Sequence, residues 1–71
     1  MEITMFPVDS SNLAAIGYDA PTLTLRVRFH SGETWQYPGV SQNVFETFLY
    51  SSSKGKFFNT YIRGKYEGYK L

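Results

Sequence analysis

The hydrophobic pattern is most regular in one stretch near the middle of the chain, where apolar and polar side chains alternate. The apolar positions of this alternation are Leu23, Leu25, Val27 and Phe29. A period of two is typical of a β-strand with one buried face, since helical spacing would scatter these side chains around a cylinder. A partner strand is expected over residues 33–37, because Gly32 tolerates the positive φ of a tight hairpin turn. The pattern predicts a β-hairpin whose second face carries Arg26 and Arg28.

The register of this hairpin decides which face the aromatic residues Trp35 and Tyr37 occupy. A two-residue loop places Trp35 opposite Arg28. Tyr37 then lies opposite Arg26, so both aromatic residues share the arginine face. A longer loop places Trp35 opposite Phe29 and brings both rings into the core. We expect the shorter loop, and the predicted nucleotide-binding cluster on the exposed sheet face consists of Arg26, Arg28, Trp35 and Tyr37.

Shorter segments on either side are expected to complete the sheet. Residues 13–18, LAAIGY, predict a strand in which Gly17 indicates a bulge or a close backbone approach. Residues 3–8 predict a short edge strand that ends at Pro7, because proline cannot donate to a β-ladder. The connections are too short for parallel crossovers, so the central strands form a three-stranded antiparallel meander. The tail, residues 65–71, is a second candidate for an edge strand or an interface segment.

Two helices are predicted in the C-terminal half of the chain. Ser41 is placed as the N-cap of a helix that runs to about Ser51, in which apolar residues recur at helical spacing. These apolar residues are Val44, Phe45, Phe48 and Leu49. A second helix is expected from Lys54 to about Arg63, with Gly64 as its C-cap. Because a sheet with one apolar face needs one covering layer, both helices are expected on the same face of a small α+β fold.

Composition narrows the class of protein. A chain of 71 residues is expected to form one domain over residues 1–71. Aromatic residues make up 18% of it, which compensates for a small core because each ring buries a large area. The chain has no cysteine, so neither a disulfide nor a zinc–thiolate site can reinforce the fold. No apolar run approaches the roughly 18 residues of a membrane span, and the N-terminus lacks the features of a signal peptide. We therefore expect a soluble, cytoplasmic protein without a membrane partner.

Positive charge gathers in the last third of the chain. Residues 1–50 carry two arginines and five carboxylates, whereas residues 51–71 carry five cations and one carboxylate. A cationic cluster favours anionic partners such as phosphates. Serine hydroxyls, lysines and free backbone N–H groups at the start of the last helix also suit a phosphate. The predicted phosphate-binding residues are Ser53, Lys54, Lys56, Arg63 and Tyr66, although a serine cap followed by solvated lysines explains the same pattern.

Catalysis, cofactor binding and metal binding are not expected from this sequence. His30 is the single histidine and lies beside Ser31, too close in sequence for a Ser-His catalytic geometry. The carboxylates show no paired spacing that would suggest acid–base work or a calcium cage. One histidine without cysteine also argues against a transition-metal site.

Several short motifs occur in an order that resembles a known family. The motifs are Asp9-Ser10-Ser11, Ile16-Gly17-Tyr18-Asp19, Gly32, Trp35-Gln36-Tyr37, Val40, Ser52-Ser53-Lys54-Gly55-Lys56-Phe57-Phe58-Asn59, Ile62-Arg63 and Tyr66. Together they resemble the KTSC domain, a small module found alone in bacterial and phage proteins and at the C-terminus of some lysyl-tRNA synthetases. Trp35 replaces the usual tyrosine of that family, which keeps a stacking surface and removes a hydroxyl. The resemblance spans about Val8 to Tyr66 and implies a non-catalytic domain for which RNA binding has been suggested.

Three functions fit these observations. The preferred one is RNA binding, in which sheet-face aromatic residues stack bases and the basic residues hold phosphates. The second is a phage-type sponge that sequesters a small signalling nucleotide within a homo-oligomer. The third is a protein interaction module whose exposed aromatic residues form a dimer or partner interface. Cross-strand pairs of arginine and aromatic side chains that only stabilise a solvated sheet face would explain the cluster without any ligand.

Overall fold

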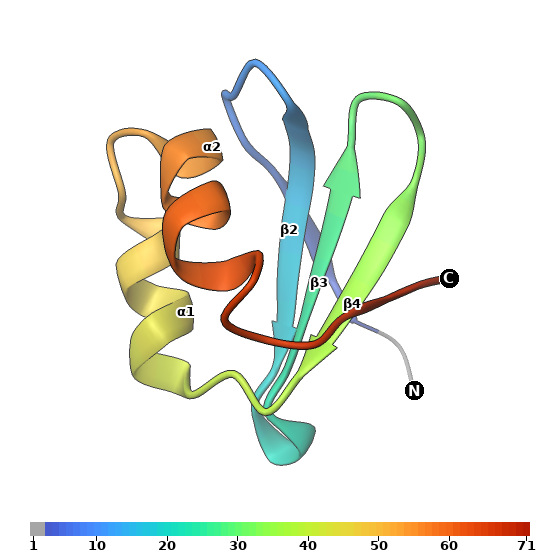
Figure 1. Ribbon diagram of the computed structural model, residues 1–71, viewed down its shortest axis with the longest axis vertical. Helices are drawn as coiled ribbons and strands as arrows, with labels where there is room; N and C mark the ends of the chain where they lie inside the picture. The colour runs from blue at the N-terminus through green and yellow to red at the C-terminus, as the bar shows by residue number, and fades with distance from the viewer. Residues whose placement is uncertain (1–2) are drawn as a thin grey trace.

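The computed structural model describes residues 3–71, in which a five-stranded antiparallel sheet is covered on one face by helices (Figure 1). The strands lie in the order of the sequence: β1 (Met5–Pro7), β2 (Leu13–Asp19), β3 (Thr24–Phe29), β4 (Thr34–Pro38) and β5 (Tyr69–Lys70). The α+β class is thus confirmed. The predicted three-stranded meander is extended to five strands, because the segments at both ends of the described chain add an edge strand.

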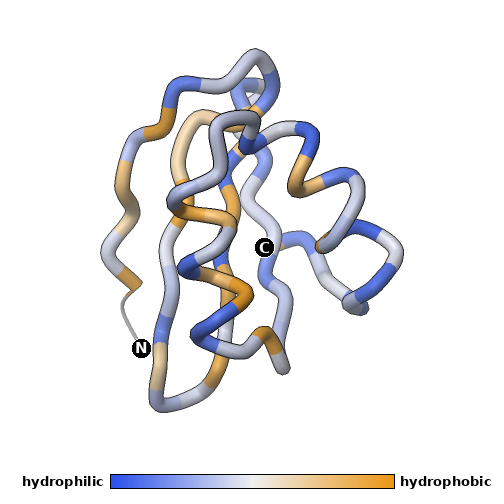
Figure 2. The backbone as a smooth tube through the Cα atoms, turned by 90° about the vertical axis from the view of Figure 1, so that its left-hand side faces the viewer, coloured by the Kyte–Doolittle hydropathy of each residue, from blue (hydrophilic) through white to orange (hydrophobic). Residues whose placement is uncertain are grey.

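The helical layer is formed by two segments. They are α1 (Gln42–Leu49) and a second segment made of α2 (Lys54–Phe57) and one π-helical turn, η2 (Phe58–Ile62). The Ser41 hydroxyl accepts a hydrogen bond from Val44 N at 3.3 Å, which confirms the predicted N-cap. Ser53 precedes α2 but makes no side-chain capping bond. Figure 2 looks onto this layer and shows hydrophobic residues recurring along the helices among hydrophilic ones.

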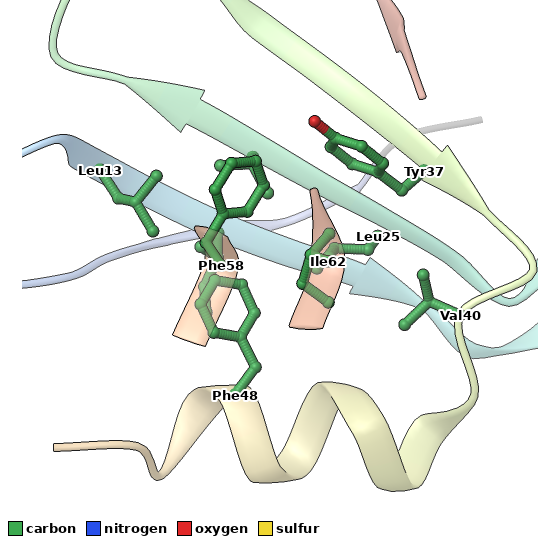
Figure 3. Close-up of a cluster of buried hydrophobic side chains, with 9 residues drawn as sticks. Leu13, Leu25, Tyr37, Val40, Phe48, Phe58 and Ile62 are labelled. Atoms are coloured by element: carbon green, nitrogen blue, oxygen red, sulfur yellow. The ribbon is translucent and has the colours of Figure 1, made fainter. Parts of the chain in front are cut away.

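The core lies between the helices and the sheet. Its fully buried side chains are Leu13, Ile16, Leu25, Val27, Val40, Phe48, Phe58 and Ile62. In Figure 3, Phe58 and Ile62 point from the second helical segment onto the strands, with Phe48 of α1 beside them. The apolar spacing predicted for both helices therefore points into one shared core, as one covering layer requires.

The predicted hairpin register is wrong. His30, Ser31 and Gly32 form the loop, because Phe29 N donates to Glu33 O and Gly32 N donates to Phe29 O, both at 2.9 Å. Gly32 takes the positive φ of 97° that closes such a turn. Trp35 consequently lies opposite Val27, and Tyr37 lies opposite Leu25. Neither the preferred pairing with arginines nor the alternative pairing of Trp35 with Phe29 is formed.

One-residue shifts in register exchange the two faces of a strand, and this shift has a physical reason. With the observed register, the rings of Trp35 and Tyr37 join the apolar residues of β3 against the helices. Tyr37 is buried, with 5% of its surface exposed. Burial of such large rings is favourable in a domain with a small core, so the longer loop wins over the tighter turn.

Two local features differ from the simple strand pattern. Leu23 was expected in the buried face of the strand, but it has a positive φ of 53°, is exposed and ends the 3-10 turn η1 (Ala20–Thr22) before β3. At Gly17, a Cβ atom would lie 2.5 Å from Thr4 O. The predicted close approach of the backbone is therefore confirmed, while the irregularity in β2 lies between Leu13 and Ala15.

The hairpin loop is tied to the loop that precedes β2. His30 N donates to Asn12 O at 3.1 Å, and His30 Nε2 lies 2.8 Å from Ser10 O. The Ser10 hydroxyl in turn donates to Asn12 Oδ1 at 3.0 Å. These bonds fix both loops at the same end of the sheet.

Candidate functional site

The observed register separates the four residues predicted to form the nucleotide-binding cluster. Arg26 and Arg28 remain on the sheet face away from the helices. There the Arg26 guanidinium donates to Gln36 Oε1, from Nε at 2.9 Å, and Arg28 Nε donates to Thr34 Oγ1 at 3.5 Å. Gln36 Nε2 also donates to the Tyr69 hydroxyl at 2.7 Å. On this face, the polar side chains therefore bond to one another across the strands.

The other two members, Trp35 and Tyr37, lie on the helix side and meet two residues from the predicted phosphate strip. Together with Arg63 and Tyr66 they line a cavity of about 410 Å³. The remaining residues that line this cavity, which we call the cleft, are Asn12, Phe29, Glu33, Phe58, Gly64 and Gly68. The structure thus joins two of the four predicted nucleotide-binding residues and two of the five predicted phosphate-binding residues in a single concave surface.

Aromatic rings form the walls and the floor of the cleft. The Trp35 and Tyr37 rings lie nearly parallel, with centroids 6.5 Å apart and 21° between their planes. Phe58 packs edge-on against Tyr37 at a centroid distance of 5.7 Å. The indole Nε1 of Trp35 donates to Glu33 Oε1 at 3.1 Å, which fixes the orientation of the indole. Because Trp35 is half-buried, part of its ring surface remains open to the cleft.

The C-terminal segment of residues 64–68, which we call the strap, crosses the helix side of the sheet from η2 toward β4 (Figure 1). It begins with a turn at Gly64, where φ is 85° and Lys65 N donates to Ile62 O at 3.2 Å. Gly68 lies directly on the Tyr37 ring, since a Cβ atom there would be 2.3 Å from a ring carbon. Beyond it, Leu71 N donates to Thr34 O at 2.8 Å. The strap therefore closes one side of the cleft and buries Tyr37.

Two polar groups of the cleft have no partner within the described chain. Among residues 3–71, neither the Tyr37 hydroxyl nor the Arg63 guanidinium forms a hydrogen bond or an ion pair with another side chain or with the backbone. Burial raises the pKa of the Tyr37 phenol, and the nearby charge of Arg63 acts in the opposite direction. The phenol therefore keeps its proton at neutral pH, so that it is able to donate a hydrogen bond.

The rest of the predicted phosphate strip lies in a separate hollow, which we call the polar hollow. It is wider than the cleft, with a volume of about 770 Å³, and contains Ser53, Lys54 and Lys56. Its other lining residues are Asp9, Ser10, Ser11, Asn12, Ser52, Gly55 and Asn59. Lys54 Nζ already donates to Ser51 O at 3.0 Å. Asn12 lines both the cleft and the polar hollow, so the two cavities are neighbours.

Sequence reasoning missed the residues that reach the cleft from distant parts of the chain. Asn12 and Glu33 were not selected as site residues, and Phe29 and Phe58 were assigned only to strand and helix patterns. Gly68, in the run Tyr66-Glu67-Gly68-Tyr69, was the local signal that the tail crosses a ring closely. Without the fold, nothing indicated that the ring would be Tyr37.

Comparison with known proteins identifies the family. The KTSC domain family matches residues 9–66 of this chain. The chain belongs to the KTSC domain family. The resemblance inferred from the order of the motifs is thereby confirmed.

The relatives of this KTSC domain are small proteins and parts of larger ones. A protein of Tsukamurella paurometabola is 36% identical over 67 residues, which cover 94% of this chain and all of that protein. The lysine–tRNA ligase of Nostoc punctiforme is 32% identical over 69 residues, which cover 93% of this chain and 12% of the ligase. The crystal structure of a KTSC domain protein from Yersinia pestis matches 99% of both chains, with a TM-score of 0.92 and 37% identity.

Other features of the described KTSC domain bear on its chemistry. Among residues 3–71, no set of histidine and acidic side chains is grouped so that it could hold a metal ion. Within the same residues, no helix has the length and apolar character required to cross a membrane. The ring of His30 is engaged with the Ser10 carbonyl oxygen rather than with a hydroxyl nucleophile.

Proposed function

We propose that this KTSC domain is a non-catalytic binding domain for nucleotide-containing ligands, with RNA as the preferred ligand class. The ligand occupies the cleft rather than the open sheet face. The observation that carries this proposal is the meeting of Trp35, Tyr37, Arg63 and Tyr66 in one cavity, although these residues come from distant parts of the sequence. An accessible indole beside an unpaired guanidinium suits the two parts of a nucleotide, its base and its phosphate.

The indole of Trp35 is the proposed stacking surface for a base. Its hydrogen bond to Glu33 holds the ring in place before a ligand arrives, so little conformational freedom is lost on binding. Stacking of one base on an aromatic side chain contributes roughly 1–3 kcal/mol, as judged from alanine substitution in other proteins. The cleft volume of about 410 Å³ also falls within the range of about 300–1,000 Å³ that is common for ligand pockets.

The polar hollow provides a continuation for a longer ligand. It begins at Asn12, the residue that it shares with the cleft, and carries the ammonium groups of Lys54 and Lys56. When a terminal or looped base of an RNA strand enters the cleft, the next phosphates of that RNA pass over the polar hollow. Lysines at such a distance act as point charges that attract phosphates without reading sequence.

Two further considerations support RNA and a non-catalytic role. The matching part of the Nostoc punctiforme relative belongs to a lysine–tRNA ligase, so in that protein the domain accompanies an enzyme named for a tRNA. The cleft itself contains one carboxylate, Glu33, and its Oε1 atom is bonded to the Trp35 indole. General acid–base catalysis would require a second carboxylate or an imidazole beside Glu33. The residues that line this cavity include neither.

The test is binding of a fluorescent mixed-sequence single-stranded RNA, measured by anisotropy at low salt. Trp35→Leu removes the stacking surface but keeps an apolar side chain, and we expect the affinity to fall by about 5- to 150-fold. Trp35→Tyr restores an aromatic ring and should recover most of the affinity. The matched control is the double variant Arg26→Gln with Arg28→Gln, which alters the open sheet face and should bind like the wild type.

The outcomes separate the site from the class of ligand. Loss of binding in the arginine double variant, with Trp35→Leu unaffected, would transfer the site to the open sheet face. Absence of binding by the wild-type domain to any RNA at low salt would remove the proposed ligand class. Circular dichroism and the melting temperature of each variant show whether the fold is retained.

A free mononucleotide is the second candidate ligand, and the size of the cleft favours it. The strap and the aromatic floor enclose space on the scale of one small molecule. A panel of nucleotides in a thermal shift assay separates the candidates, because a saturating ligand of the folded state raises the melting temperature. A mononucleotide that binds as tightly as the RNA oligomer would make this second candidate the better one.

A further inference from the structure

We infer that the Tyr37 hydroxyl and the Arg63 guanidinium form an anion subsite inside the cleft, which binds a phosphate group of the ligand. This inference deepens the proposed function and rests on it. It assigns the first phosphate to a pair of residues from β4 and from the end of η2, rather than to the lysines at the start of α2.

The hydroxyl of Tyr37 is the main observation. Tyr37 is 95% buried, since 5% of its surface is exposed, and it lines the cleft. Its hydroxyl forms no hydrogen bond with the residues that the structure describes. Among residues 3–71, no buried polar side-chain atom lacks a hydrogen-bond partner, so this hydroxyl is not sealed in the core and opens onto the cleft. An unused donor at the wall of a cavity is therefore available to a ligand.

Packing alone does not require a hydroxyl at this position. The face of the Tyr37 ring is covered by Gly68, and Phe58 contacts the ring edge-on. Phenylalanine would fill the same volume and make both contacts without a polar group to desolvate. The hydroxyl thus adds nothing to the core and instead presents a hydrogen-bond donor to the cleft.

Arg63 supplies the charge, and its backbone is held firmly. Arg63 N donates to Phe58 O at 2.9 Å, and Arg63 forms a β-bridge with Tyr66 across the turn at Gly64. Its guanidinium has no carboxylate partner within residues 3–71. A guanidinium binds the oxygens of a phosphate through two parallel hydrogen bonds, which a lysine cannot do. The charge of Arg63 also acts on the Tyr37 phenol, so the two groups lie within electrostatic range of each other.

The charges around the cleft give the ligand one orientation. Glu33 is the carboxylate that lines the cleft, and it bonds to the indole of Trp35. A phosphate is repelled from this side and attracted to the side of Arg63. The base consequently lies over Trp35 near Glu33, and its phosphate lies at Tyr37 and Arg63. The polar hollow is a weaker first site, because it contains Asp9 and because Lys54 is bonded to a backbone carbonyl.

The experiment compares a nucleoside with its 5′-monophosphate, using quenching of Trp35 fluorescence and calorimetry on the whole domain. Adenosine and AMP form one pair of probes, guanosine and GMP form the other, and inorganic phosphate is measured alone and as a competitor. With the wild type, we expect the phosphate group to strengthen binding on the order of tenfold. Inorganic phosphate should compete with the nucleotide and not with the nucleoside.

Two variants locate the subsite, and one variant controls for charge. Tyr37→Phe and Arg63→Gln should each remove most of the gain from the phosphate and leave nucleoside binding unchanged. Lys65→Gln removes the same charge outside the cleft and should preserve the gain. Arg63 is exposed, so the Arg63→Gln variant tests the subsite even if Tyr37→Phe alters the packing beneath the strap.

The results that overturn this inference differ from those that overturn the proposed function. Equal affinity of the wild type for nucleoside and nucleotide, or a full phosphate gain in both cleft variants, refutes the anion subsite while base stacking stands. If the affinity gain from the phosphate group is lost with Lys54→Gln and Lys56→Gln instead, the first phosphate binds in the polar hollow. Absence of binding to nucleosides, nucleotides and RNA removes both the subsite and the function.

Discussion

The two faces of the β3–β4 hairpin carry similar chemical groups but use them differently. On the open face, Arg26 is bonded to Gln36, which is bonded in turn to Tyr69. On the helix face, the Tyr37 hydroxyl and the Arg63 guanidinium border a cavity and form no hydrogen bond within residues 3–71. On the open face, the polar side chains are thus bonded to one another. The helix face, in contrast, keeps donors that are available to a ligand.

This difference shows that positive charge alone does not mark a binding surface. Arg26 has lost part of its capacity to hold a phosphate, because its donors point at a side-chain oxygen on the neighbouring strand. A donor that faces a hollow and has no partner in the protein is a stronger indication, because its hydrogen-bonding capacity is available to a ligand. Four variants test this contrast between the faces.

The largest effect is expected from Gly68→Ala, which acts on the helix face. The new Cβ atom would lie 2.3 Å from the Tyr37 ring, so the strap or the ring must move. Overpacking of this kind usually costs about 1–3 kcal/mol. Urea denaturation should show this loss in the free energy of unfolding. Gly32→Asn is the control, because nothing lies within 4 Å of that position and asparagine tolerates positive φ. Equal stability of Gly68→Ala and wild type would show that the strap does not press on Tyr37.

A somewhat smaller effect is expected from Gln36→Leu, which breaks the network of the open face. Gln36 is buried and bonds to Arg26 and Tyr69, so its loss should lower the free energy of unfolding by about 1–2 kcal/mol. RNA affinity at a temperature where the variant is folded should stay within twofold of the wild type, on the order of the error in such comparisons. A large loss of affinity without a loss of stability would assign binding to the open face.

The polar hollow is tested by the double variant Lys54→Gln with Lys56→Gln. If both lysines contact phosphates, the slope of log affinity against log salt should become less steep by about 1.4, since each contact with a single strand contributes about 0.7. The double variant Lys65→Gln with Lys70→Gln has the same net charge and changes residues outside both cavities. Identical slopes for the two double variants would show that the hollow attracts RNA only through the overall charge of the domain.

The smallest effect is expected from Glu33→Gln. Glutamine keeps an oxygen that can accept the hydrogen bond from Trp35 and removes the negative charge beside the cleft. RNA should bind a few-fold more tightly at low salt, and the gain should shrink as salt screens the charge. Weaker binding of this variant would instead show that the carboxylate itself contacts the base.

The sequence predicted the local features of the fold and failed where distant segments meet. The cap at Ser41 and the helical spacing of Val44 and Phe48 were correct, because each depends on residues within one or two turns. The register of the hairpin depends on whether one residue belongs to the loop, and Gly32 permits both answers. Burial of Trp35 and Tyr37 against the helices decides between them, and this burial is invisible in the segment itself.

The candidate site could be predicted residue by residue but not as a surface. Trp35, Tyr37, Arg63 and Tyr66 were all selected from the sequence, in two groups assigned to different places. They meet because the turn at Gly64 sends the strap back across the sheet. Arg26 and Arg28 were selected for the same reason as Arg63, and their separation from the aromatic residues follows from the register alone.

The bonds of His30 have a mechanical consequence for the two cavities. His30 holds the backbone of Ser10 and Asn12 against the hairpin loop, and Asn12 lines both the cleft and the polar hollow. A ligand that displaces Asn12 in one cavity therefore also changes the shape of the other cavity. Any cooperativity that results is reciprocal, because each ligand must alter the affinity for the other by the same factor.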